Sequence, residues 1–265
     1  MLLRPTELRR LAFAALFLLA SCSRSTPQEN AARPAANTAS IRSEPEVVAD
    51  NELDREDIIL AALEATTAAA LGKDDHVSQD QLKGRKFEVR LRFGCPGMNN
   101  MARSLAYDDK AQVLRAKVRS DLAEQPLPIS DVLYRKYEGA VGFVLGQPWL
   151  LSAGCPKSDF AKMASGQPTI ALAQLFTADE SRAQRPGGEY ELTKPMKPEE
   201  ANKEGLDLVL SGRLTELADG RSIHCGARDG APVCVVAGKI DRVAFARPGS
   251  DKPLGEWGLG LGPAR

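Results

Sequence analysis

The spacing of apolar residues before position 73 is that of a helix. Side chains suited to one buried face recur every three or four positions: Ile58, Ile59, Ala62, Leu63, Thr66, Ala69 and Ala70. Asn51 or Asp54 is suited to cap the start of this segment, and Gly72 is suited to end it. Residues 51–73 are therefore predicted to form one amphipathic helix. It packs against a sheet or, alternatively, contacts a partner through residues 54–71.

From residue 83 onward the period changes to two. In residues 86–93, KFEVRLRF, every second side chain is apolar, which is typical of a strand with one buried face. Residues 105–107 and 111–113 flank a turn and predict a hairpin. Further short apolar runs follow, and turn residues separate several of them: 142–145, 149–151, 169–176, 189–192, 208–214, 222–225, 233–236, 239–245 and 254–257.

This pattern predicts a mainly β fold over residues 83–262. The expected architecture is an antiparallel sandwich or a partly open barrel with one amphipathic helix at its N-terminal side. Gly212 lies inside an apolar run and predicts a β-bulge. The pattern leaves two arrangements open, one β domain or two small β subdomains that meet near residue 200.

The first 21 residues have the order of charges and apolar residues that export signals have. Arginines at positions 4, 9 and 10 precede an apolar run over residues 11–20. That run is too short to span a bilayer core of about 30 Å, but it suits a secretory signal peptide. The next residues, Leu19-Ala20-Ser21-Cys22, resemble the lipobox of bacterial lipoproteins. The alternative is an ordinary signal peptide in which Cys22 is incidental.

The resemblance to lipoproteins implies a location. In that family residues 1–21 are removed, and the cysteine, here Cys22, becomes the first residue and carries the lipid that anchors the chain to the membrane. An Asp at the next position commonly holds a lipoprotein at the inner membrane. Ser23 stands there in this chain, which implies the outer membrane, facing the periplasm. Residues 22–50 are rich in Ala, Ser and Pro, which predicts a disordered tether.

Composition narrows the expected partners and chemistry. The formal net charge is zero, so no general attraction for nucleic acid is predicted. Aromatic residues make up only 5% of the chain, so few side chains are available to stack against sugars or the bases of single-stranded nucleic acid. The chain has no Gly-x-Ser-x-Gly nucleophile motif. The sequence therefore leads us to expect no cofactor, no metal site and no catalytic residue.

Four cysteines remain after Cys22, namely Cys95, Cys155, Cys225 and Cys234. In an exported chain an even number of cysteines predicts disulfides. Cys225 and Cys234 lie on neighbouring predicted strands. Cys95 and Cys155 each end an apolar run before a proline, so both lie where strand pairing stops. We therefore favour the pairs 95–155 and 225–234. Redox exchange would instead use Cys-x-x-Cys spacing, and zinc would need more partners than two histidines supply.

Basic residues alternate with apolar ones in two of the predicted strands. If the strands around residues 90 and 116 share a sheet, one solvent face gathers Arg90, Arg92, Arg115, Lys117 and Arg119. Such a patch would attract an anionic envelope component or another envelope protein. The alternative is a charged face that only keeps the domain soluble.

Together these features predict a lipid-anchored envelope protein with a binding or scaffolding role. One alternative is an envelope enzyme or enzyme inhibitor with a site built from loops, for which a cleft of titratable groups around His224 would be the sign. The other is a subunit of an envelope assembly that contacts its partners through the helix at residues 54–71.

Overall fold

A computed structural model describes residues 52–73, 79–96, 102–123, 136–146, 148–157, 169–180, 188–201, 204–228 and 230–258. The chain divides into two units, Met1–Val47 and Val48–Arg265, and all described residues belong to the second. The signal peptide, Cys22 and the tether of residues 22–50 lie outside the described residues, so the predictions about them remain predictions.

The helix α1 (Arg55–Ala70) begins directly after the predicted cap Asp54 and ends two residues before the predicted Gly72, with Leu71 as its C-cap. At its start Asp54 and Asp57 form a reciprocal capping box. The Asp54 carboxylate accepts from the Asp57 N–H, and the Asp57 carboxylate accepts from the Asp54 N–H, each at 3.0 Å. At its end Gly72 has a φ of 61°, a left-handed conformation that glycine adopts without strain.

The buried face of α1 is narrower than the sequence pattern predicts. Ile58, Ile59 and Ala62 are buried as expected, and Ala65 joins them. Leu63 is 44% exposed, and Ala69 and Ala70 are exposed too, so the prediction is wrong for these three. A residue that follows a buried one lies about 100° further around a helix, which turns Leu63 away from the sheet beneath Ala62.

The strands have the following bounds: β1 (Lys86–Phe93), β2 (Arg103–Asp108), β3 (Val113–Arg119), β4 (Gly139–Leu145), β5 (Thr169–Phe176), β6 (Glu189–Pro195), β7 (Leu206–Leu214), β8 (Ile223–Arg228), β9 (Ala231–Ala246) and β10 (Pro253–Gly258). A short 3₁₀ helix, η1 (Asp121–Ala123), follows β3. Residues 149–151, predicted as a strand, form a turn and a bend instead. Pro148 cannot donate to a ladder, and the Leu150 carbonyl accepts from Arg55 rather than from a strand.

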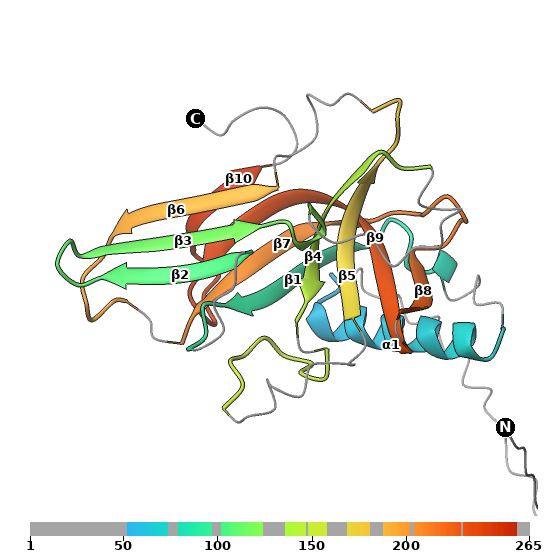
Figure 1. Ribbon diagram of the computed structural model, residues 1–265, viewed down its shortest axis with the longest axis horizontal. Coiled ribbons are helices and arrows are strands. Elements are labelled where there is room, and N and C mark those ends of the chain that lie inside the picture. Colours follow the sequence, from blue (N-terminus) through green and yellow to red (C-terminus); the bar gives the residue numbers. More distant parts are fainter. Residues whose placement is uncertain are drawn as a thin grey trace, which may run out of the picture. The chain divides into compact units, whose positions relative to one another are not determined.

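Within the described residues the strands form two sheets (Figure 1). The larger has the order β1-β7-β9-β5-β4, and β8 and β10 also pair with β9. The smaller has the order β2-β3-β6. The fold is therefore mainly β with two sheets and one helix in the described part of the chain. Strands from both sides of residue 200 pair in the larger sheet, so this sheet does not divide there.

β9 connects the two halves of the larger sheet because it is 16 residues long. Residues 231–237 of β9 pair with β8 and β5, and residues 238–246 pair with β7 and β10. The strands pair mainly antiparallel, as the sequence predicts, but β5 and β9 pair in parallel. The chain between them contains β6, β7 and β8, which is ample length for the crossover that a parallel pair needs.

The predicted bulge occurs at Gly212. Ser211 lies opposite Arg242 and Gly212 lies opposite Ile240, so Asp241 is the extra residue on β9. A Cβ at Gly212 would overlap the Lys239 carbonyl oxygen. The close approach of the two backbones therefore requires glycine at this position.

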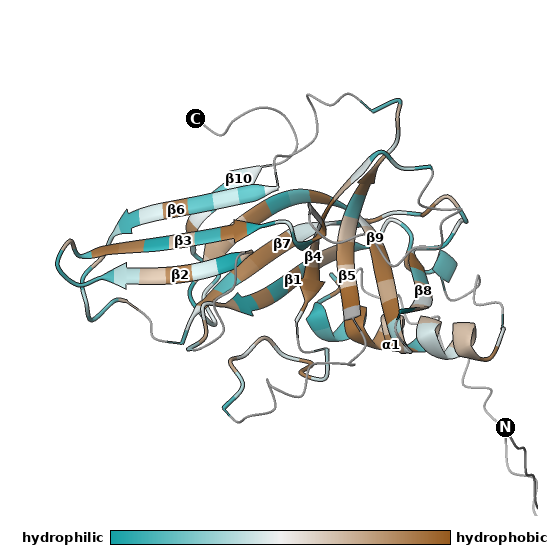
Figure 2. Ribbon diagram, in the orientation of Figure 1, coloured by the Kyte–Doolittle hydropathy of each residue, from teal (hydrophilic) through white to brown (hydrophobic). Residues whose placement is uncertain are grey.

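The hydrophobic core lies between the two sheets and beneath α1, and apolar residues line β5, β7 and β9 (Figure 2). A chain of aromatic contacts links the sheets. The Trp257 ring lies 4.8 Å from Phe245 on β9 and 5.5 Å from Tyr190 on β6, measured between centroids. In the part of the chain that the structure describes, α1 is too short and too polar to cross a membrane, and no other helix there could do so.

Candidate functional site

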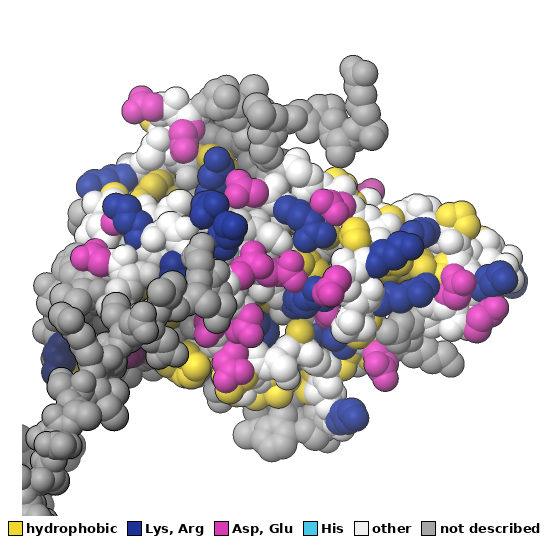
Figure 3. Space-filling model, turned by 180° about the vertical axis from the view of Figure 1, so that it is seen from behind, with side chains coloured by type: hydrophobic (Ala, Val, Ile, Leu, Met, Phe, Trp, Pro, Cys, Tyr) yellow, Lys and Arg dark blue, Asp and Glu magenta, His cyan; other side chains and the backbone are white. Residues whose placement is uncertain are grey.

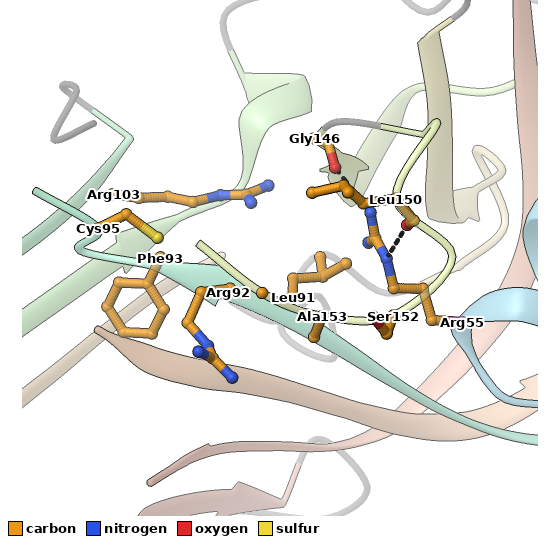
Figure 4. Close-up of a pocket in the computed structure, with 11 residues that line it drawn as sticks. Arg55, Leu91, Arg92, Phe93, Cys95, Arg103, Gly146, Leu150, Ser152 and Ala153 are labelled. Carbon is orange, nitrogen blue, oxygen red and sulfur yellow. Dashed lines mark hydrogen bonds between the residues drawn. The ribbon is translucent and has the colours of Figure 1, made fainter. Parts of the chain in front are cut away.

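A cavity of about 130 Å³ lies between β1, the start of α1 and the segment that follows β4 (Figure 4). Three of the described residues that line it are arginines from three different elements. Arg55 comes from the first turn of α1, Arg92 from β1 and Arg103 from the start of β2. Apolar side chains, including Leu91 and Leu150, complete the wall. We take this cavity as the candidate functional site.

Arg55 fixes the segment after β4 in place. It is 7% exposed, and it donates from Nε to the Leu150 carbonyl at 3.1 Å and from Nη2 to the Gly146 carbonyl at 2.7 Å (Figure 4). The arginine directly follows the helix cap Asp54, so a well-formed helix end holds its backbone. A positive charge in the first turn opposes the helix dipole, so this position does not favour arginine for helix stability.

Arg103 reaches the same cavity from the other sheet. Its Nη2 donates to the Val144 carbonyl at 2.8 Å and forms an ion pair with Asp121 of η1. The same Asp121 carboxylate accepts from the Val144 N–H at 2.8 Å. These bonds tie β2, η1 and β4 together, and they aim the guanidinium of Arg103 at the cavity (Figure 4).

The electrostatic environment of Arg55 is unfavourable for its own charge. Burial, and next the positive charge of Arg103, lower the pKa of Arg55 to about 10. Arg92 is turned away from Arg103 in Figure 4, and its Nε donates to Asp207 at 2.5 Å. The Asp207 side chain is only 2% exposed, so this ion pair is well shielded from water.

A disulfide closes the wall of the cavity. Cys95, two residues beyond β1, is bonded to Cys155, and their Cα atoms are 5.6 Å apart. Cys155 directly follows the wall residue Gly154, so the disulfide holds the end of the described segment 148–155 that lines the cavity. The pair is the one that the sequence favours, and its role at a cavity could not be read from the cysteine spacing.

A wider cleft of about 510 Å³ adjoins the cavity. The two share Arg55, Arg92, Ser152 and Ala153. Unlike the cavity, the cleft is lined by several carboxylates: Glu52, Asp54, Glu56, Glu88, Asp207 and Asp251. The site therefore combines a positive inner cavity with an acidic outer cleft.

The second disulfide supports α1 and not the cavity. Cys225 on β8 and Cys234 on β9 lie directly opposite each other, and their Cα atoms are 4.1 Å apart. The hydroxyl oxygen of Thr66 lies 3.0 Å from the Cys234 sulfur and 3.4 Å from the Cys225 sulfur. This is the other pair that the sequence favours, and it lies under the middle of the helix.

The predicted basic patch is divided between the two sheets. β1 carries Arg90 and Arg92 in the larger sheet, whereas β3 carries Arg115, Lys117 and Arg119 in the smaller one. The condition for a single patch, that these strands share a sheet, is therefore not met. Both strands have the same alternating pattern, and this pattern shows which face is buried but not which strand is the neighbour.

Carboxylates lie close to several of these basic residues. Arg90 forms ion pairs with Glu88 at 2.9 Å and Asp251 at 2.7 Å. Lys117 lies between Glu189 and Glu191 of β6, and these carboxylates raise the pKa of Lys117. On the face seen in Figure 3, basic and acidic side chains are interspersed. Local ion pairs thus reduce the field that the sequence alone predicts.

His224, considered as the centre of an alternative enzyme site, pairs with Asp219. Its Nδ1 lies 2.9 Å from the Asp219 carboxylate. Neither residue lines the cavity or the cleft. Among the described residues no cluster of three His, Cys, Asp or Glu side chains is arranged to hold a metal ion.

Partner contact through the helix at residues 54–71 remains a prediction. Three leucines of this segment are exposed, namely Leu60, Leu63 and Leu71.

Sequence reasoning missed Arg55 and Arg103, the two residues that define the cavity. The sequence holds one indication of a role for Arg55, because a basic residue in the first turn of a helix is unfavourable for helix stability. The sequence holds no such indication for Arg103, since the role of this residue depends on the position of β2 relative to β4.

Comparison of the chain with protein-family models, with curated proteins and with solved structures finds no match. The argument for function therefore stands on the site itself.

Proposed function

We propose that this chain is a lipid-anchored, periplasm-facing protein of the bacterial outer membrane that binds a ligand in the arginine cavity and the adjoining cleft. The observation that carries the binding role is that Arg55, Arg92 and Arg103, from three elements, all line one cavity. Arginine presents its N–H donors in a planar fork that matches oxyanions, so it is the side chain of choice for recognising them.

The rigidity of the walls supports a binding role. The disulfide of Cys95 with Cys155 and the two hydrogen bonds from Arg55 hold Gly146 and residues 148–155 in place before any ligand arrives. A site that is already ordered loses less conformational entropy when a ligand binds, and more of the contact energy then appears as affinity. Small-molecule sites in proteins are commonly preformed in this way.

The binding role is tested by photo-crosslinking in living cells. A photoreactive amino acid replaces Leu151, which lines the cleft and is 39% exposed, or Lys110, an exposed residue of the turn after β2. We expect specific adducts from position 151 that diminish when Arg55→Gln is added and persist when Arg115→Gln is added. Adducts that are the same from both positions, or that do not respond to Arg55→Gln, contradict the proposal.

The proposed anchor rests on the order Leu19-Ala20-Ser21-Cys22 after the apolar run. We expect cells to incorporate labelled palmitate into the wild-type chain but not into a Cys22→Ser variant. A Ser23→Asp variant serves as the matched control, because it should keep the label but move to the inner-membrane fraction. Label that persists in the Cys22→Ser variant would rule out lipidation at this residue.

A further inference from the structure

We infer that the ligand of this site has two oppositely charged ends, with a carboxylate in the arginine cavity and a cationic group in the acidic cleft. A peptide with a free carboxyl terminus and a nearby basic residue belongs to this class. The inference rests on the proposed binding function and goes further, because it names the chemistry of the ligand at each end of the site.

The size of the inner cavity limits what enters it. Its volume of about 130 Å³ is a few times the roughly 30 Å³ that one water molecule occupies in the liquid. A carboxylate with the carbon that bears it fits this space. A longer ligand would extend toward the neighbouring cleft, which shares Ser152 and Ala153 with the cavity.

The charge of the inner cavity favours an anion. None of its described lining residues is acidic, and two of its arginines, Arg55 and Arg103, oppose each other closely enough to lower the pKa of Arg55. A carboxylate between the two guanidinium groups would replace this repulsion with two attractions. Such interactions are stronger in a partly buried site than in water, since the effective dielectric constant is lower.

The ion pairs of the site orient the arginines. Asp121 holds Arg103 in a fixed direction at the cavity, whereas Asp207 holds Arg92 turned away from Arg103 (Figure 4).

The charge of the outer cleft favours a cation. In this cleft Asp207 pairs with Arg92, and both Glu88 and Asp251 pair with Arg90. The remaining carboxylates of the described lining residues lie at the start of α1 and include the exposed Glu52 and Glu56. These carboxylates lie beside the cavity, so they would repel a phosphate dianion and attract a ligand with a cationic end.

Isothermal titration of the detergent-solubilised mature lipoprotein with matched probes tests the inference. The probes are the tripeptide Lys-Ala-Ala, its C-terminal amide, its analogue with both amino groups acetylated, and inorganic phosphate. We expect Lys-Ala-Ala to bind, the amide to bind about tenfold more weakly or less, and the acetylated analogue to lose several-fold in affinity. No binding of Lys-Ala-Ala at millimolar concentration, equal binding of the amide, or tighter binding of phosphate overturns the inference.

Variants locate the two ends of the ligand. Arg55→Gln should weaken Lys-Ala-Ala about tenfold and leave the amide unchanged, while the control Arg115→Gln changes neither. Glu56→Gln alters an exposed side chain and should weaken Lys-Ala-Ala but not the acetylated analogue, so it gives an answer even if Arg55→Gln does not fold. An effect of Glu56→Gln that is equal for both peptides overturns the assignment of the cation.

The two proposals fail separately. If crosslinks at position 151 depend on Arg55 while Lys-Ala-Ala does not bind, the binding function stands and the ligand class is wrong. If neither the crosslinks nor the peptide depends on Arg55, both proposals are wrong.

Discussion

Cys95 and Cys155, 60 residues apart in the chain, are bonded to each other at the edge of the arginine cavity. This bond joins the end of β1 to the wall segment that follows β4. It therefore restrains both the unfolded chain and one wall of the binding site.

Replacing both cysteines, Cys95→Ala with Cys155→Ala, should lower the free energy of unfolding and weaken ligand binding. Chain entropy predicts a loss of about 4 kcal/mol for a closed loop of 60 residues. Urea denaturation measures the free energy of unfolding, and titration with Lys-Ala-Ala measures the affinity of the site.

The matched control removes Cys225 and Cys234, whose separation of 9 residues predicts a loss of about 3 kcal/mol in the free energy of unfolding. Since that pair lies under α1, its loss should leave the intrinsic affinity of the folded protein unchanged; an equal loss of affinity in both variants would contradict this division of roles.

The Tyr190 hydroxyl is buried without a hydrogen-bond partner among the described residues. Tyr190→Phe removes this unsatisfied group and keeps the ring against Phe143 and Trp257. We expect the variant to be more stable at neutral pH by about 1 kcal/mol, measured by thermal or urea unfolding. Tyr137→Phe is the matched control and should destabilise, because the Tyr137 oxygen accepts from the Ala218 N–H at 2.7 Å.

The gain in the free energy of unfolding from Tyr190→Phe should increase at alkaline pH. Burial raises the pKa of Tyr190 to about 12, whereas the unfolded chain has the ordinary value near 10. Between pH 10 and 12 the unfolded state loses this proton and the folded state keeps it, so the wild type loses stability as the pH rises. The phenylalanine variant lacks this loss. Urea unfolding at pH 9 and pH 11 measures the difference, and a gain that stays constant would show that the hydroxyl is not buried as described.

Gly212→Ala should destabilise the larger sheet by roughly 2 kcal/mol or more, as is typical when a side chain is forced into occupied space. The added Cβ would overlap the Lys239 carbonyl oxygen at the bulge between β7 and β9. Gly258→Ala in β10 is the control, since a Cβ there meets no atom within 4 Å. Urea midpoints compare the two, and similar midpoints would mean that the bulge tolerates a side chain.

Asp54→Ala should remove the capping box of α1 and lower stability by about 1 kcal/mol. It should also weaken binding, because the adjacent residue Arg55 holds the cavity wall through Gly146 and Leu150. Unfolding and peptide titration on the same sample give both values. Loss of stability with unchanged affinity would show that the helix end does not position Arg55.

Much of the local structure could be predicted from the chain. The two-residue period identifies β1, β3 and β7, the capping residues locate α1, and Gly212 marks the bulge. Each of these features depends on residues that are neighbours in the sequence or on the backbone conformation that a residue type favours. Both can be deduced from the order of the residues. The failures share a different cause. Leu63 was placed on the buried face of α1 and residues 149–151 in a strand, because an apolar residue in a short segment does not reveal which neighbour covers it.

The sequence by itself determined the fold class, the helix with its caps and the favoured pairing of the four cysteines. It also contains the motif on which the proposed location rests, in Leu19 to Cys22. The tertiary structure decided the strand order, the parallel pair β5–β9 and the separation of Arg90 from Lys117. It alone brought Arg55 and Arg103, 48 positions apart in the sequence, to one cavity. The reason is physical: periodicity records which side of an element avoids water, whereas a binding site depends on which elements meet.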